Sequence, residues 1–303
     1  MHPADRFSSA IAASHSIACV GLDPRPALIP PELVADSLSR HGDTVEAVAE
    51  AFLTFNRGII HAITGHCAAV KPQVACYEAY GPAGMHCLFE TIRFARERGI
   101  EIIVDGKRND IGSTAEHYAQ GWLGSAPGLG GKSLPGWGGD WLTVNGYLGA
   151  DGIAPFTGKA PTTTGIFVLV KTSNPSSGEL QDQALADGSA VMEAMARLVQ
   201  RWGQGRQGTC GLNDIGAVVG ATWPAQARRL RELMPDTLFL VPGYGAQGGS
   251  AADAKAGARP DGSGILINSS RGIIGAWKEK TYAGLPWTDA ARAALEAMNK
   301  DLE

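Results

Sequence analysis

Two carboxylates and a lysine stand at short spacing directly after an apolar run, in the segment Asp105-Gly-Lys107-Arg-Asn-Asp110. In an extended strand, residues two apart point to the same side, so we expect Asp105 and Lys107 to face the same way. Lys71 follows another apolar run. If the two runs form adjacent strands, these four side chains make a cluster of alternating charge.

Such a cluster favours particular chemistry. At about 4 Å and an effective dielectric of about 20, each opposite-charge contact is worth about 4 kcal/mol, which keeps lysines charged and rigidly held. Charged lysines suit proton delivery or anion binding better than Schiff-base formation, which needs a neutral amine. The alternative is an exposed, solvated loop. The position after an apolar run and before a capping-box pattern, Ser113-Thr-Ala-Glu116, favours a site and predicts that a helix opens there.

Two glycine-rich segments later in the chain suggest a phosphate site. Residues 242–249 read PGYGAQGG and include Gln247, and residues 268–272 read NSSRG and include Arg271. Backbone N–H groups of such loops bind phosphate in α/β barrels, and an arginine adds a charge-assisted contact. Turn formation alone is the competing interpretation, but the order of the two segments favours phosphate binding.

The elements that must position these residues alternate in type. Longer helical patterns, at 44–64, 82–98, 189–202 and 224–233, separate short apolar runs. Continuous apolar runs are typical of parallel strands covered on both faces. The alternation predicts an α/β fold, a single-domain (β/α)8 barrel over residues 1–303, with a doubly wound open sheet as the alternative. The eight expected strands are 17–21, 67–70, 100–104, 141–144, 166–170, 215–219, 237–241 and 264–267.

Polar residues follow nearly every expected strand. Besides the charged segment above, these include Asp23, Asn145 and the run Lys171-Thr-Ser-Asn-Pro175. Because the carboxyl ends of barrel strands meet at one face, we expect these groups to collect there.

Two segments lie outside the repeating pattern. Residues 121–140 are rich in Gly, Pro and Ser, and we expect an inserted surface loop that is mobile, with a functional loop as the alternative. A C-terminal helical extension is expected from about residue 288.

Composition excludes several classes of protein. The 303 residues are 44% hydrophobic, with 26 Lys+Arg against 30 Asp+Glu, which argues against disorder and against a general nucleic-acid binder. The five cysteines form no CxxC pair, and no run of about 18 apolar residues or signal peptide is evident. The seven histidines form no HxH or HExxH pair, so no metal site is expected. We expect a cytoplasmic protein without membrane or nucleic-acid partners.

A set of motifs resembles the orotidine 5′-phosphate decarboxylase family, in particular its longer bacterial (type 2) subgroup. The motifs are CVGLDPRP, AVKPQVACYEAYG, VDGKRNDIGSTA, LTVNGYLG, FVLVKTSNPSSG, GAVVGAT, VPGYGAQGG and INSSRGII, in the expected order from residue 17 to about 275. Gly106 and Asn109 depart from the subgroup's usual residues, and the 121–140 segment is longer than typical.

The resemblance implies a reaction and its catalytic residues. It implies a carbon–carbon lyase of pyrimidine biosynthesis that converts orotidine 5′-monophosphate to uridine 5′-monophosphate without metal or organic cofactor. Lys71, Asp105, Lys107 and Asp110 would form the catalytic tetrad, with Lys107 stabilising and protonating a carbanion at C6 of the pyrimidine.

The resemblance also implies binding residues and a partner. Asp110, Ile111 and Thr114 would reach the neighbouring subunit's site, so the active unit would be a homodimer. The remaining substrate contacts would come from Asp23 and Lys71 to the ribose, Ser173 to the pyrimidine, Thr143 near the ligand, and Gln247 and Arg271 to the phosphate.

Two other functions remain open at this point. Sugar-phosphate decarboxylases or synthases of the same superfamily use Mg²⁺ and usually have an acidic residue where Lys71 stands. A non-catalytic nucleotide-phosphate-binding protein would need the phosphate site without the tetrad.

Overall fold

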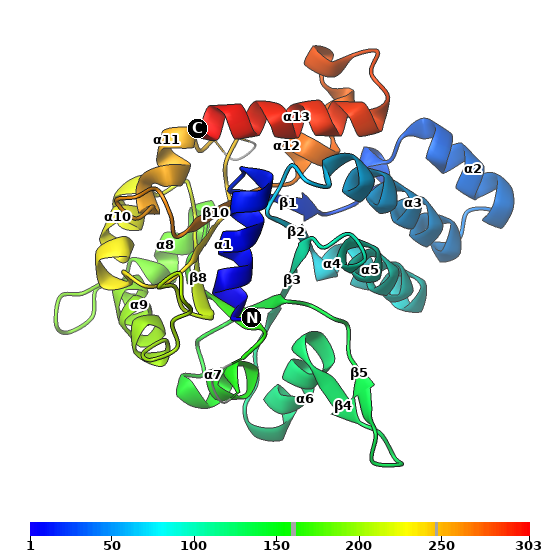
Figure 1. The fold of residues 1–303 in the computed structure, drawn as a ribbon. Coiled ribbons are helices and arrows are strands. Elements are labelled where there is room, and N and C mark those ends of the chain that lie inside the picture. Colours follow the sequence, from blue (N-terminus) through cyan, green and yellow to red (C-terminus); the bar gives the residue numbers. More distant parts are fainter. Residues whose placement is uncertain (159–161, 246–247) are drawn as a thin grey trace. The chain divides into compact units, whose positions relative to one another are not determined.

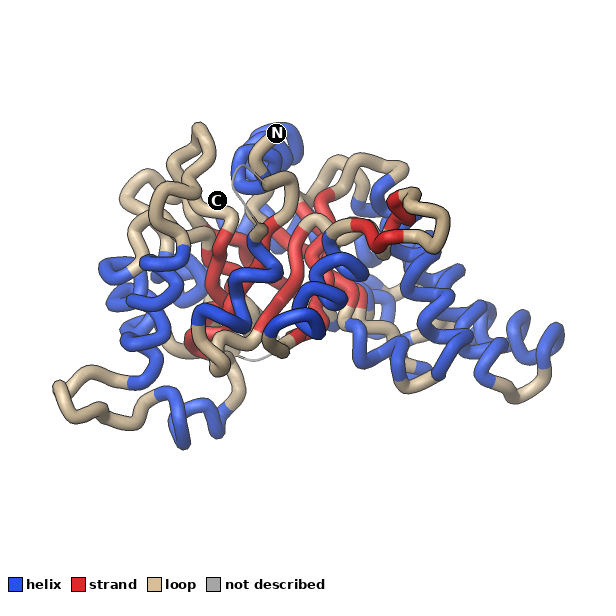
Figure 2. Tube along the Cα trace, turned by 90° about the horizontal axis from the view of Figure 1, so that it is seen from below, coloured by secondary structure: helices blue, strands red, loops and turns tan. Residues whose placement is uncertain are grey.

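A computed structural model describes residues 1–158, 162–245 and 248–303. Eight parallel strands form a closed barrel in the order β1-β10-β9-β8-β7-β6-β3-β2. Their alternation with helices along the chain can be followed in Figures 1 and 2. The (β/α)8 prediction is confirmed, and the open-sheet alternative is wrong. The barrel strands are β1 (Ala18–Leu22), β2 (Ala69–Pro72), β3 (Glu101–Arg108), β6 (Trp141–Val144), β7 (Gly165–Lys171), β8 (Ile215–Val219), β9 (Phe239–Val241) and β10 (Ile265–Ser269).

The chain packs as two compact units. One unit, called here the 10–106 unit, comprises residues 10–106, 269–301 and 303. The other, called the 107–268 unit, comprises residues 1–9, 107–268 and 302. The division falls within β3, so Asp105 and Lys107 belong to different units.

In the 10–106 unit, β1, β2 and β3 pair in parallel, with Gly21 opposite Lys71. Helices α3 (Val45–Ile63) and α5 (Gly81–Arg96) pack against each other, and Thr44 caps α3 by accepting a hydrogen bond from the backbone N–H of Ala47. Helix α13 (Trp287–Leu302) confirms the expected C-terminal extension, and Trp287 packs against Phe55 of α3. Shorter helices are α2 (Pro31–His41), α4 (Val74–Glu78) and α12 (Arg271–Ile274).

In the 107–268 unit, β6 to β10 pair in parallel, and every residue of β6 and β8 is buried. Trp141 stacks on Phe167 with ring centroids 4.7 Å apart. Phe7, from α1 (Pro3–Ser14), packs on Trp141 with ring centroids 5.1 Å apart. The other helices are α6 (Gly112–Leu123), α7 (Ala150–Thr157), α8 (Gly178–Gln181), α9 (Val191–Trp202), α10 (Pro224–Leu233) and α11 (Ala251–Ala254).

The start of α6 differs from the prediction. The helix begins at Gly112, and Ile111 is its N-cap with no side-chain hydrogen bond. Ser113 therefore lies inside the first turn, where its carbonyl oxygen accepts a hydrogen bond from His117. The predicted capping box at Ser113–Glu116 is wrong, although the helix itself is present.

The 121–140 segment, expected as an inserted surface loop, contains a short hairpin. Strands β4 (Ser125–Pro127) and β5 (Ser133–Pro135) pair in antiparallel fashion. Trp137 stacks on Trp122 of α6 with centroids 4.8 Å apart, and its backbone N–H donates to the carbonyl of Gly121 at 2.7 Å. These contacts fix the base of the hairpin to α6.

Candidate active site

A buried ion pair joins β2 and β3, as the sequence predicts. The Lys71 Nζ donates to Asp105 Oδ2 at 2.6 Å, and the two residues are only 5% and 6% exposed. The Gln73 side-chain amide donates to the same oxygen at 3.0 Å. Asp105 therefore accepts from both a cation and an amide, which fixes its carboxylate in one orientation.

The ammonium of Lys71 is held in its charged form. Burial by itself would lower the pKa of Lys71, but the carboxylates of Asp105 and Asp23 outweigh burial and raise the pKa above its ordinary value. A permanently charged lysine fits electrostatic and binding chemistry and does not fit a Schiff base.

Asp23 follows β1 and is half-buried. Its Oδ1 is buried and has no hydrogen-bond partner among the described residues. A buried carboxylate oxygen is normally hydrogen-bonded, so this oxygen is suited to accept from a ligand hydroxyl.

A buried polar chain that the sequence did not reveal supports the end of β1. The hydroxyl of Tyr77 donates to the carbonyl of Leu22 at 3.0 Å, and the Asn56 amide donates to Tyr77 at 2.9 Å. Tyr77 and Asn56 are fully buried, and Leu22 directly precedes Asp23. These contacts hold the backbone from which the Asp23 side chain emerges.

Arg271 is exposed at the first residue of α12. The preceding residue, Ser270, lies so close to β1 that a Cβ on Gly21 would approach the Ser270 Cβ to 2.6 Å. Because Gly21 has no side chain, Ser270 can lie against β1. Arg271 therefore follows directly after a residue that contacts the strand preceding Asp23.

Lys107 has a left-handed backbone, with a φ of 46°. Such a conformation is uncommon for a residue other than glycine and often occurs at functional sites. Its N–H donates to the Thr143 hydroxyl at 2.9 Å, and the next residue, Arg108, accepts from the N–H of Asn145 at 3.0 Å. Because the backbone is left-handed at Lys107, regular strand alternation does not apply there, and the expectation that Lys107 faces the same way as Asp105 stays a prediction.

The residues after Lys107 are accessible. Asp110 is half-buried, and its Oδ1 accepts from the N–H of Ile111 at 2.8 Å. Ile111 is 54% exposed, and Thr114 is also exposed.

The remaining predicted site residues are Thr143, Ser173 and Gln247. Thr143 is 1% exposed and contacts the backbone of Lys107, so its described hydrogen bond is to the protein. Ser173 follows β7 and is half-buried. Gln247 lies outside the described residues.

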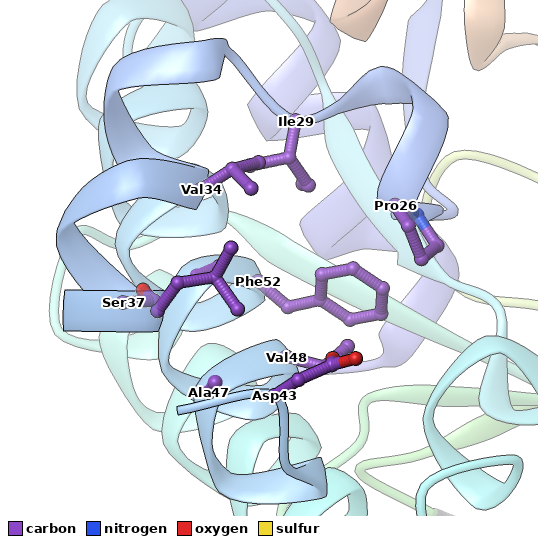
Figure 3. Close-up of a pocket in the computed structure, with 10 residues that line it drawn as sticks. Pro26, Ile29, Val34, Ser37, Asp43, Ala47, Val48 and Phe52 are labelled. Carbon is purple, nitrogen blue, oxygen red and sulfur yellow. The ribbon is translucent and has the colours of Figure 1, made fainter. Parts of the chain in front are cut away.

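A cavity of about 160 Å³ lies apart from the predicted site residues, between η1 (Pro26–Leu28), α2 and α3 (Figure 3). Its lining is mostly apolar, with Phe52 and Val34 projecting into it and Asp43 at one side. None of the predicted site residues lines this cavity.

The described part of the chain was considered for metal-binding groups, membrane-spanning helices and reactive cysteines. No group of three or more His, Cys, Asp or Glu side chains could hold a metal ion among the described residues. No described helix is long and apolar enough to cross a membrane. Burial raises the pKa of the Cys67 thiol to about 12, so this cysteine is a packing residue.

Comparison with known proteins gives a consistent result across nearly the whole chain. Residues 18–283 match the model of the orotidine 5′-phosphate decarboxylase / HUMPS family. An orotidine 5′-phosphate decarboxylase of Rhodopirellula baltica is 45% identical over 305 residues, covering 99% of this chain and 98% of that protein. One from Caldicellulosiruptor saccharolyticus is 36% identical and covers 97% of each chain.

A solved structure agrees with these relatives. The Leishmania donovani OMP decarboxylase is 31% identical, with a TM-score of 0.74, over 100% of this chain and 98% of that one. Together with the barrel and the buried Lys71–Asp105 pair, these matches show that the chain belongs to the orotidine 5′-phosphate decarboxylase / HUMPS family.

Proposed function

We propose that this protein decarboxylates orotidine 5′-monophosphate to uridine 5′-monophosphate, as a carbon–carbon lyase of pyrimidine biosynthesis. The observation that carries the proposal is the buried Lys71–Asp105 pair within a chain of this family. Sugar-phosphate enzymes of the same superfamily use Mg²⁺ and usually have an acidic residue at the position of Lys71. The charged ammonium of Lys71 would repel a divalent cation at that position, which favours the nucleotide substrate.

The proposed substrate contacts are assigned for each unit in turn. In the 10–106 unit, Asp23 and Lys71 bind the ribose hydroxyls, and the partnerless Asp23 Oδ1 supplies an acceptor for one of them. Arg271 binds the phosphate through a charge-assisted contact, and Gln247 is proposed to assist it. In the 107–268 unit, Ser173 binds the pyrimidine.

The chemical step requires stabilisation of a carbanion. When the bond between C6 and the carboxylate breaks, its electron pair stays on C6 and CO₂ leaves. The Lys107 ammonium stabilises that charge and then transfers a proton to C6, after which solvent restores the lysine's proton. Asp105 lies beside the substrate carboxylate, and their repulsion is relieved as CO₂ departs. Lys71 holds Asp105 in its orientation through the 2.6 Å contact.

The active form is proposed to be a homodimer in the cytoplasm. Asp110, Ile111 and Thr114 would enter the neighbouring subunit's site. The 54% exposure of Ile111 supports this assignment, since a β-branched apolar residue at an exposed helix start gains stability when a partner covers it. Tyr147 and Leu148 are exposed apolar residues of the same unit.

An ultraviolet assay of orotidine 5′-monophosphate, with and without EDTA, tests this function. We expect turnover that EDTA does not change, and no turnover by the Lys107→Ala variant with its melting temperature retained. Lys132→Ala, at an exposed lysine of the hairpin segment, is the matched control and should keep full activity. Ligand binding without any absorbance change would favour the non-catalytic binding protein, and loss of activity in EDTA would favour the Mg²⁺ enzyme.

A further inference from the structure

A second buried lysine lies at the end of β7, and the proposed mechanism does not use it. Lys171 is 0% exposed, and its Nζ contacts both carboxylate oxygens of Asp182, at 2.7 and 2.8 Å. The same ammonium lies 4.7 Å from the ring centroid of Trp223. The pairing of β7 with β8 shifts register between Leu169 and Lys171, which marks a bulge just before this lysine. Bulges often redirect the chain next to active sites.

The next residue, Thr172, has its main chain held by side chains. Its N–H donates to Gln181 Oε1 at 3.0 Å, and the Gln181 amide donates to the Thr172 hydroxyl at 2.8 Å. Its carbonyl accepts from the indole N–H of Trp223 at 3.0 Å. The N–H of Thr172 is therefore bound by Gln181 of the short helix α8, and its carbonyl is bound by Trp223, which lies 51 positions later in the chain.

Ser173 is confined from the β8 side. Its carbonyl accepts from the Thr222 hydroxyl at 3.3 Å. A Cβ on Gly220 would come within 2.9 Å of the Ser173 Cα, so the two backbones are in close contact. The carbonyl of Lys171 accepts from the N–H of Gly220 at 2.8 Å, which continues the sheet up to this point. Residues 171–173 are thus fixed from two directions within one unit.

We propose that Lys171, Gln181, Asp182 and Trp223, called here the β7 clamp, are positioning residues that hold Ser173 in place to recognise the pyrimidine ring. The proposal rests on the proposed function, because it takes the base contact of Ser173 from it. A contact group that is already fixed loses little conformational freedom on binding, so a clamp of this kind increases affinity for the base without touching the ligand.

The β7 clamp acts on base recognition and not on the phosphate. Its members all belong to the 107–268 unit, whereas Arg271 and Asp23 belong to the 10–106 unit. A ligand that carries ribose and phosphate but no base should therefore bind independently of the clamp. This separates the proposed role from a purely structural one, in which damage to the loop would affect every ligand.

The test compares Gln181→Met with Gln183→Met in the full chain. Gln181→Met removes two hydrogen bonds to Thr172 at similar side-chain volume, whereas Gln183, two residues later, is exposed. Binding of uridine 5′-monophosphate and of ribose 5-phosphate is measured by calorimetry, with steady-state kinetics on orotidine 5′-monophosphate. We expect about tenfold weaker nucleotide binding and a higher KM in Gln181→Met, with ribose 5-phosphate binding unchanged. Gln183→Met should match the wild type.

A second variant keeps the test decisive if Gln181→Met does not fold. Trp223→Phe keeps an aromatic ring beside Lys171 but removes the N–H that holds the Thr172 carbonyl, and we expect the same selective loss. Unchanged nucleotide binding, or equal weakening of both ligands, would overturn the β7 clamp. If the wild type turns over orotidine 5′-monophosphate, either of these results overturns only the β7 clamp, and the proposed function stands. A wild type that neither binds nor converts the nucleotide refutes both proposals.

Discussion

The hydroxyl of Thr143 is expected to control the activity of Lys107 without touching the substrate. Thr143→Val removes the oxygen that accepts from the Lys107 N–H at 2.9 Å and changes the side-chain volume little. Thr143 is 1% exposed, whereas Lys107 is exposed and the hydrogen bond between them is partly buried, so water replaces the hydroxyl as acceptor only incompletely. The substitution therefore acts on the backbone that carries the proposed proton donor.

The magnitude follows from two costs. Loss of a partly buried hydrogen bond costs about 1 kcal/mol, and a left-handed backbone at a residue other than glycine costs on the order of 1–2 kcal/mol. Without the hydroxyl, both costs favour relaxation of Lys107 from its φ of 46°. A relaxed state favoured by about 1.4 kcal/mol leaves roughly one molecule in ten in the active geometry. We expect kcat to fall about tenfold, KM to change by less than about twofold, and the free energy of unfolding to fall by about 1 kcal/mol.

The assay is steady-state decarboxylation of orotidine 5′-monophosphate, with urea unfolding of the same preparations. Thr143→Ser keeps the hydroxyl and should restore most of kcat, which separates the hydrogen bond from packing of the threonine methyl group. If Thr143→Val retains wild-type kcat, the hydroxyl does not hold Lys107 in its active conformation. A change in KM alone would instead indicate that Thr143 contacts the substrate directly.

Three further outcomes are expected. Arg271→Ala should raise KM for the nucleotide at least tenfold while ribonucleoside binding stays unchanged, and unchanged KM and kcat would remove Arg271 from phosphate binding. Lys71→Met should abolish turnover and cost about 3–5 kcal/mol in urea unfolding, because it breaks a buried ion pair by removing the ammonium that contacts Asp105. A cost below about 1 kcal/mol would contradict this. Burial opposes ionisation of Asp5, but the N–H groups of Cys210 and Thr209 outweigh it and lower the pKa of Asp5 to about 2. Its folded-state pKa lies below its ordinary 3.8, so Asp5 stabilises the fold above pH 3.8 and loses that effect as pH falls toward 2. Asp5→Asn should cost about 1–2 kcal/mol at pH 7, with the difference from wild type shrinking below pH 3.8 in denaturant titrations.

The strands could be predicted because parallel strands buried on both faces leave continuous apolar runs in the sequence. The predicted ranges 141–144 and 215–219 coincide with β6 and β8, and the predicted helix 224–233 coincides with α10. Helix α2 was not predicted because its apolar face is short, consisting of Leu33, Val34 and Leu38, and Ser37 is its only buried residue. The hairpin at 121–140 depends on the stacking of Trp122 on Trp137, which local turn residues do not reveal.

The site was predictable in its residue types but not in its geometry. The adjacency of the two expected strands correctly brought Lys71 to Asp105, because both residues lie on paired strands. Strand alternation could not settle the direction of Lys107, because its backbone is left-handed and its N–H donates to a residue 36 positions later. The contacts that hold the site's side chains, such as those made by Gln73 and Tyr77, come from residues that no motif singled out.

Three lysines at strand ends show a common pattern. Lys71 is fixed by Asp105 from the next strand, Lys107 is fixed through its backbone by Thr143, and Lys171 is fixed by Asp182 and Trp223. Lysine side chains are long and lose much conformational freedom when held, so each fixed position requires a partner from elsewhere in the fold. A barrel provides such partners, because the end of each strand lies beside groups on neighbouring strands and loops. Substitutions at these partners should therefore release the lysines from their fixed positions and alter catalysis or base recognition, although the lysine residues themselves are unchanged.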